Sequence, residues 1–181
     1  MLVETDAPFL TPHPQDVVVR VPVVDHQRLA EALGEVDVPA EGTLLRVLDE
    51  EGAPPAVVFH CFSGDAAMAR TCVDAGYVLS FAGPVTFKNA AALRAAAALV
   101  PDGQLLVETD APFLTPHPHR GRANEPYCLP WTVRALAHVR GIPAERVADG
   151  ARRTAEAVFG LAALPPVADA PAPGAPAARS T

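Results

Sequence analysis

Residues 105–110 read LLVETD, a stretch that begins with a short apolar run. Similar short apolar runs occur in VVFH at 57–60 and YVLSF at 77–81. A fourth apolar run, VVVRVPVV at 17–24, resembles them, although Pro22 donates no hydrogen bond to a sheet. Short runs that are apolar on both faces are typical of buried parallel strands. The sequence therefore predicts a parallel sheet built from these runs.

Segments with helical character separate the strand candidates. Ser63 is a good N-cap for the second of them, and Gly76 and Gly141 are typical helix stops. The predicted helices cover residues 43–51, 65–75, 90–99, 130–140 and 144–159. Strands that alternate with helices indicate βαβ units, so the predicted fold class is α/β with a parallel sheet.

The 181-residue chain divides into three parts, and its apolar content of 50% is enough to bury a core. Residues 1–42 form an atypical N-terminal segment, 43–164 carry most of the strand and helix pattern, and 165–181 form a Pro/Ala-rich tail that we expect to be disordered. The segment LVETDAPFLTPHP at 2–14 recurs unchanged at 106–118. A duplication, a recombination scar or a misassembled reading frame would explain this repeat, and a second functional loop is the alternative.

Charge and cysteine content argue against several classes of protein. The 14 Lys and Arg against 21 Asp and Glu give a net charge of −7, which is unsuited to coating nucleic acid non-specifically. Three cysteines without a CxxC pair argue against a disulfide framework or a thiolate zinc site. The N-terminus lacks the basic start of a signal peptide, and no apolar run is long enough to span a bilayer. We therefore expect a cytoplasmic protein with no membrane partner.

Three of the four strand candidates lead into a side chain that can bind a metal: His26, His60 and Asp110. Because the carboxyl ends of parallel strands meet at one edge of a sheet, these side chains are expected to lie close together. Two imidazoles and a carboxylate suit Zn²⁺, Mn²⁺ or a related ion, which would lower the pKa of a bound water. Strand-end His and Asp residues also serve as caps or turn residues, so both interpretations remain open. Glu108 points the same way as Asp110 and either touches the site or forms a hydrogen bond behind it.

Several motifs carry a resemblance to a known family. In order along the chain they are DHQR at 25–28, HCFSG at 60–64, SFAGPVTF at 80–87, ETDAP at 108–112 and RGRANEP at 120–126. In type, order and spacing, the last four resemble the successive motifs of TatD-type metal-dependent deoxyribonucleases. The first is similar, more loosely, to the Ile-His-x-Arg strand of that family.

The resemblance implies a TIM-barrel-like (β/α)₈ fold of the amidohydrolase kind, of which this chain would hold the second half. It also implies hydrolysis of phosphodiester bonds in DNA with a divalent metal ion, Mg²⁺, Mn²⁺ or Zn²⁺, as cofactor. His60, Asp110 and His26 match metal ligands of the family. The implied catalytic residues are Asp110 and His60, and Asp110 would orient or deprotonate the attacking water.

A basic loop follows the ETDAP motif in this acidic chain. We expect it to receive the phosphates of the substrate, because arginine can donate two parallel hydrogen bonds to a phosphate group. The predicted substrate-binding residues are His117, Arg120 and Arg122. An ordinary solvated loop is the alternative interpretation.

The chain also departs from the family pattern. Family members begin with a strand that ends in His-x-His and carry a later glutamate that bridges the metals, and neither feature is present here. Complete members run near the usual barrel length of about 250 residues. We therefore expect at most one weak metal site, from His60, Asp110 and His26, with impaired activity and self-association through an open sheet edge. The alternative functions are a non-catalytic remnant that binds a metal or self-associates, and an ester hydrolase of the D-aminoacyl-tRNA deacylase type.

Overall fold

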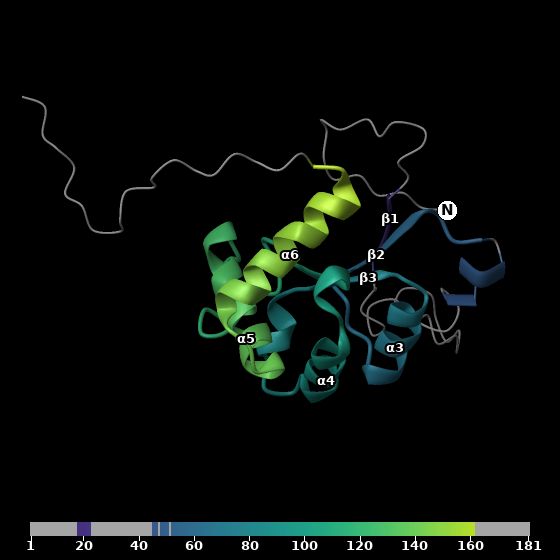
Figure 1. Ribbon diagram of the computed structural model, residues 1–181. Helices are drawn as coiled ribbons and strands as arrows, with labels where there is room; N and C mark the ends of the chain where they lie inside the picture. The colour runs from purple at the N-terminus through teal and green to yellow at the C-terminus, as the bar shows by residue number, and fades with distance from the viewer. Residues whose placement is uncertain (1–17, 23–44, 47, 51, 162–181) are drawn as a thin grey trace, which may run out of the picture.

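The computed structural model of the protein describes residues 18–22, 45, 46, 48–50 and 52–161 (Figure 1). His26, the first copy of the repeat at 2–14 and the tail at 165–181 lie outside the described residues. Within the described part of the chain, no helix is both long enough and apolar enough to cross a membrane.

The strands form one parallel sheet in the order β1-β2-β3-β4. Their bounds are β1 (Val18–Pro22), β2 (Ala56–His60), β3 (Val78–Phe81) and β4 (Leu105–Val107). The prediction of a parallel sheet from the four apolar runs is confirmed. Pro22 ends β1, which lies at an edge of the described sheet, where a missing N–H group is tolerated.

Helices connect the strands and cover both faces of the sheet. They are α3 (Ala66–Asp74), α4 (Ala91–Leu99), α5 (Leu129–Arg140) and α6 (Ala144–Phe159), with short 3₁₀ turns η1 (Gly83–Thr86), η2 (Asp102–Gln104) and η3 (Pro126–Cys128). Residues 45, 46 and 48–50 are also helical, within the predicted segment 43–51. Figure 1 shows α3 and α4 on one side of the sheet and α6 crossing the other.

The helix ends follow the predicted signals with one exception. Gly141 ends α5 in the left-handed conformation, as expected for a glycine stop. The prediction of Ser63 as an N-cap is wrong, because Asp65 caps α3. Its Oδ1 accepts hydrogen bonds from the N–H groups of Ala67 and Met68 at 2.9 and 3.0 Å. A carboxylate directly before the first helical residue reaches these unpaired donors, whereas Ser63 lies two residues further out.

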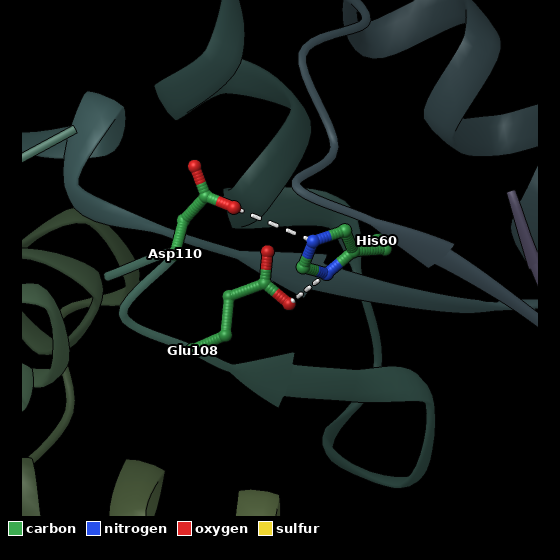
Figure 2. A group of neighbouring side chains, drawn as sticks. All are labelled: His60, Glu108 and Asp110. Carbon is green, nitrogen blue, oxygen red and sulfur yellow. Dashed lines mark hydrogen bonds and ion pairs between the residues drawn. The ribbon is translucent and has the colours of Figure 1, made fainter. Parts of the chain in front are cut away.

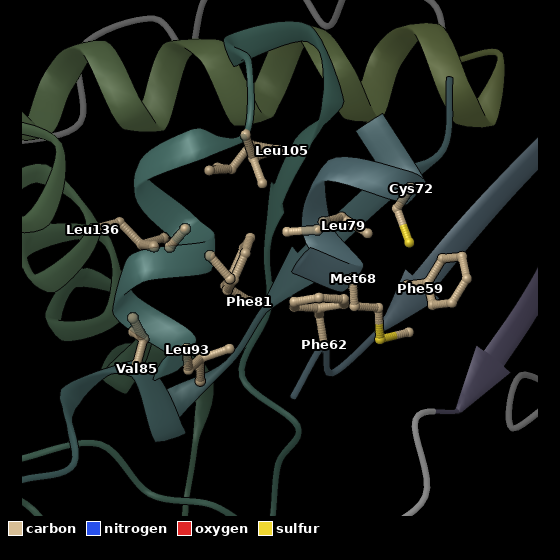
Figure 3. Packing of buried hydrophobic residues seen from close by; sticks show 14 of the residues in the cluster. Phe59, Phe62, Met68, Cys72, Leu79, Phe81, Val85, Leu93, Leu105 and Leu136 are labelled. Atoms are coloured by element: carbon tan, nitrogen blue, oxygen red, sulfur yellow. The ribbon is translucent and has the colours of Figure 1, made fainter. Parts of the chain in front are cut away.

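Alternate strand residues face α3, α4 and α5 and form the main core (Figure 3). Phe59, Leu79 and Phe81 are fully buried there. The ring of Phe62 meets those of Phe59 and Phe81 edge to face, with ring centroids 6.5 and 5.7 Å apart. Aromatic rings bury large apolar areas, so this cluster gives the carboxyl ends of the strands a rigid base.

The other face of the same strands carries a smaller apolar cluster that packs against α6. Its buried members are Val58, Val78 and Leu106. Because side chains alternate along a strand, the residues two positions further along point the same way. Those residues are His60, Ser80 and Glu108, at or directly after the carboxyl ends of three neighbouring strands. Strand alternation thus places three polar side chains together at one edge of the sheet.

Candidate metal centre

His60 lies between two carboxylates (Figure 2). Its Nδ1 donates a hydrogen bond to Glu108 Oε2 at 2.6 Å, and its Nε2 lies 3.4 Å from Asp110 Oδ1. One potential ligand atom from each of these side chains lies within 4.8 Å of the others. The structure therefore brings together two of the predicted ligands, His60 and Asp110, and adds Glu108 to them.

The order of the strands explains why these side chains meet. Strand β3 lies between β2, which ends at His60, and β4, which ends directly before Glu108. The N–H of Glu108 donates to the carbonyl oxygen of Phe81 on β3 at 3.0 Å and so extends the ladder of the sheet. Ser80 on β3 donates its hydroxyl to Glu108 Oε2 at 2.6 Å. One oxygen of Glu108, Oε2, thus accepts hydrogen bonds from a side chain of β2 and a side chain of β3.

The second oxygen of Glu108, Oε1, is buried and has no hydrogen-bond partner within the described residues. A buried carboxylate oxygen without a partner costs free energy, and a nearby cation offsets that cost. When the imidazole of His60 is neutral and donates from Nδ1, its Nε2 presents a lone pair toward Asp110 Oδ1. Two acceptors that face each other suit a cation between them. The residues present therefore fit a divalent ion with mixed nitrogen and oxygen donors.

Asp110 is held in place by the backbone of its own loop. It has a left-handed conformation, with φ of 57°, which aspartate adopts more readily than most residues. The side chain of Asn124, a residue only 2% exposed, donates to the carbonyl oxygens of Thr109 and Phe113 at 2.5 and 2.6 Å. These bonds clamp the loop on both sides of Asp110, so its carboxylate is directed toward His60 by a fixed turn.

Burial raises the pKa of Asp110, and the neighbouring charge of Glu108 adds to this shift while His60 opposes it. Asp110 therefore takes up a proton at a higher pH than an exposed aspartate does. A bound ion and this proton compete for the same carboxylate, since metal ligands must be deprotonated.

Cys61 directly follows His60 but is not part of the ligand set. It has a left-handed conformation with φ of 50° and lies at intermediate exposure. Burial raises its pKa to about 12, and the charges of Asp110 and Glu108 contribute to the rise. The thiol therefore stays protonated near neutral pH and is a poor nucleophile.

The predicted substrate-binding residues lie on the loop that follows the ETDAP motif. Arg120 and Arg122 line a cavity of about 250 Å³ beside this motif, and His117 lines a neighbouring one. Among the described residues, His117 is not part of the group of potential ligands around His60. The remaining predicted ligand, His26, lies outside the described residues.

The loop after β3 supports the loop that carries Asp110. A Cβ added at Gly83 would collide with the carbonyl oxygen of Leu114, so only glycine allows this close approach. The hydroxyl of Thr86 accepts a hydrogen bond from the N–H of His117 at 2.9 Å. The position of the Asp110 loop therefore depends on the loop of the preceding strand.

One support of the site was missed by sequence reasoning. The side chain of Ser80 holds Glu108. Ser80 gave a signal, because it is the one serine in the apolar run at 77–81 and points the same way as the strand-end ligands.

A parallel α/β sheet with an imidazole and carboxylates at the carboxyl ends of its strands is the arrangement of metal-dependent hydrolases with TIM-barrel-type folds. Residues 17–160 match a family model described as TatD related DNase. The chain belongs to this family, and the resemblance drawn from its motifs is confirmed.

Individual relatives agree with this assignment. The chain is 60% identical over 122 residues to a Mycobacterium tuberculosis protein described as an uncharacterized metal-dependent hydrolase TatD, covering 67% of this chain and 46% of the relative. It is 37% identical over 142 residues to YabD of Bacillus subtilis, described as an uncharacterized metal-dependent hydrolase, covering 78% and 52%. The crystal structure of YjjV, a TatD homologue from Escherichia coli, superposes with a TM-score of 0.63 at 28% identity, over 67% of this chain and 47% of that one. The chain thus spans about half the length of the relatives it matches.

Replacing Glu108 with glutamine is expected to weaken ion binding about 10- to 100-fold, because the residue that fixes the orientation of a ligating histidine loses its charge. Titration calorimetry with Mn²⁺ or Zn²⁺ measures this affinity, and the unchanged chain is expected to bind one ion. The matched control is Glu145→Gln, at an exposed position in the first turn of α6. Equal affinity in the unchanged chain and both variants would contradict a role of Glu108 in ion binding. Tight binding of two ions per chain would contradict a centre for a single ion.

Proposed function

We propose that this chain hydrolyses phosphodiester bonds in DNA at the centre formed by His60, Glu108 and Asp110. The observation that carries the proposal is their convergence, with an imidazole placed between two carboxylates. Membership of a family described as TatD related DNase supports DNA as the substrate.

Each of the three side chains would have its own role in hydrolysis. His60 Nε2 and Asp110 Oδ1 would hold the ion, which when bound polarises a phosphoryl oxygen and lowers the pKa of water. Glu108 would accept the Nδ1 proton of His60 and so keep Nε2 directed at the ion. Asp110 Oδ2 would orient the attacking water and accept its proton, because a carboxylate near a cation stays ionised and remains an acceptor.

Arg120, Arg122 and His117 would contact the substrate phosphates. The cavity of about 250 Å³ beside the ETDAP motif supports this role, since both arginines line it. A guanidinium can donate two parallel hydrogen bonds to one phosphate group, which fixes the orientation of the strand.

The donor set favours an ion that accepts both nitrogen and oxygen ligands. Imidazole suits Zn²⁺, whereas carboxylates suit Mg²⁺ and Mn²⁺. We propose a single divalent ion, with Mn²⁺ and Zn²⁺ ahead of Mg²⁺, because a histidine lies at the centre of the cluster.

The test is cleavage of labelled single-stranded DNA by the full chain with Mg²⁺, Mn²⁺ or Zn²⁺, with a chelator, and with the His60→Ala variant. Cleavage that requires the ion and is lost in the variant supports the proposal. A D-aminoacyl-tRNA substrate in a parallel reaction tests ester hydrolysis on the same scaffold. No cleavage of either substrate by a folded chain that binds the ion would favour the non-catalytic alternative.

Two further expectations from the sequence remain proposals. We propose that residues 43–164 form the part of the chain that resembles half of a TatD barrel, and that copies of the chain associate through an edge of the sheet. In the described sheet, β1 and β4 each pair with one neighbouring strand. Such edges present unpaired backbone groups to another chain. Light scattering that reports a monomer at micromolar concentration would contradict association.

A further inference from the structure

A groove of about 450 Å³ lies between η1, α4 and α5 and has no role in the metal centre. The charged residues that line it are all basic: Lys88, Arg94 and Arg134. His117 and His138 line it too, and none of its lining residues carries a carboxylate. In a chain with a net charge of −7, this concentration of basic groups indicates an anionic ligand.

The basic residues of the groove have different tasks. Arg94 donates hydrogen bonds to the carbonyl oxygens of Phe87 and Lys88 at 2.6 and 3.3 Å, and so holds the loop after η1 in place. Lys88 and Arg134 are exposed. Their charges are therefore accessible to a ligand that enters the groove from solvent.

Aromatic rings lie beside these charges. The guanidinium of Arg134 lies 4.8 Å from the centroid of the Trp131 ring, and that of Arg120 lies 3.9 Å from the centroid of the Phe87 ring. Both rings line the groove. Alternating rings and cations suit single-stranded nucleic acid, because bases stack on rings while phosphates contact cations.

The groove adjoins the cavity beside the ETDAP motif, because the two share a lining residue. Phe87 lines both, and Arg120 and Pro112 line the cavity. Pro112 lies two residues after Asp110 in the clamped loop. Basic and aromatic side chains therefore line both the cavity next to the loop of Asp110 and the groove that reaches α5.

We propose that this groove binds the single strand of nucleic acid that extends from the phosphodiester held at the metal centre. Phosphates would contact Lys88 and Arg134, and a base would stack on Trp131. The proposal rests on the proposed function for the identity of the substrate. It adds a binding site outside the metal centre, and a strand that occupies it would be several nucleotides long.

Binding is measured by fluorescence anisotropy with a labelled oligothymidylate of about 12 nucleotides, within the range that single-strand grooves cover. A chelator is present throughout, so the result does not depend on the metal centre. The variants are Lys88→Ala with Arg134→Ala, Arg134→Lys, and Trp131→Ala. The matched control is Arg70→Ala, at an exposed position on α3. Thermal unfolding of each variant confirms that it is folded.

The double variant is expected to bind about 10-fold more weakly. The slope of log affinity against log salt concentration is expected to shrink by about 0.7 for each phosphate that the variant no longer neutralises. Arg134→Lys keeps the slope, because it keeps the charge. Trp131→Ala weakens binding about 10-fold with the slope unchanged, as expected for loss of stacking. Affinity and slope in the double variant equal to those of Arg70→Ala would overturn the proposal, and so would unchanged affinity in Trp131→Ala.

The two proposals fail in different ways. If the groove variants behave as expected but the unchanged chain cleaves no DNA with any ion, the proposed hydrolysis is wrong and the binding site stands. If DNA is cleaved but the groove variants bind the oligonucleotide in chelator as tightly as the unchanged chain does, the proposed hydrolysis stands. The groove then does not bind the strand.

Discussion

Replacing Asp110 with asparagine is expected to lower the rate of ion-dependent DNA cleavage by about 10²- to 10⁴-fold, the range typical of a lost general base. The amide keeps the shape of the side chain but removes the negative charge that faces His60 Nε2 at 3.4 Å. It also removes the acceptor to which the attacking water would give its proton. The initial rate of cleavage of labelled single-stranded DNA, at saturating Mn²⁺, measures the loss.

The matched control for this variant is Asp74→Asn, at the exposed last residue of α3. It removes the same charge from the chain without touching the metal centre, so its rate is expected to equal that of the unchanged chain. If Asp110→Asn cleaves DNA as fast as Asp74→Asn, Asp110 has no catalytic role and the centre proposed here is wrong.

Replacing Phe59 with alanine is expected to reduce the free energy of unfolding by about 3–5 kcal/mol, as for other buried phenylalanines. Phe59 is fully buried, and its ring lies 5.9 Å from that of Tyr77 and 6.5 Å from that of Phe62. Removing the ring leaves a cavity next to the end of β2, because Phe59 directly precedes His60 in the chain. Urea denaturation followed by circular dichroism measures the loss.

The control is Phe113→Ala, because Phe113 is 68% exposed and contributes little apolar burial. A change of no more than about 0.5 kcal/mol is expected for it, as for most surface substitutions. Similar losses in the two variants would show that the cluster around Phe59 is not the core of the fold.

The sequence was sufficient for most of the fold, because its local signals agree with one another. The helix predicted over 144–159 has the same bounds in the structure, and the helix predicted over 130–140 begins one residue earlier. The strand ends predicted the pairing of His60 with Asp110, since parallel strands bring their carboxyl ends to one edge.

What the sequence did not predict depends on contacts between segments that are distant along the chain. The N-cap of α3 is Asp65 and not Ser63. Both are good capping residues, and only the path of the backbone decides which side chain reaches the unpaired N–H groups. The position of Cys61 is a second example: the strand ends at His60 and the chain turns into a left-handed conformation, which places the thiol near Asp110 and Glu108. The hydrogen bond from Ser80 to Glu108 forms only because β3 and β4 are neighbours in the sheet. No local sequence pattern reveals that order of strands.

The hydrogen bonds that unite His60, Ser80 and Glu108 cross three adjacent strands, so the centre exists only when all three strands are aligned correctly. A slip of one residue in any of them would turn its polar side chain to the opposite face. An ion bound at this centre would therefore stabilise only the native alignment of the strands, and shifted alignments would lack that added stability.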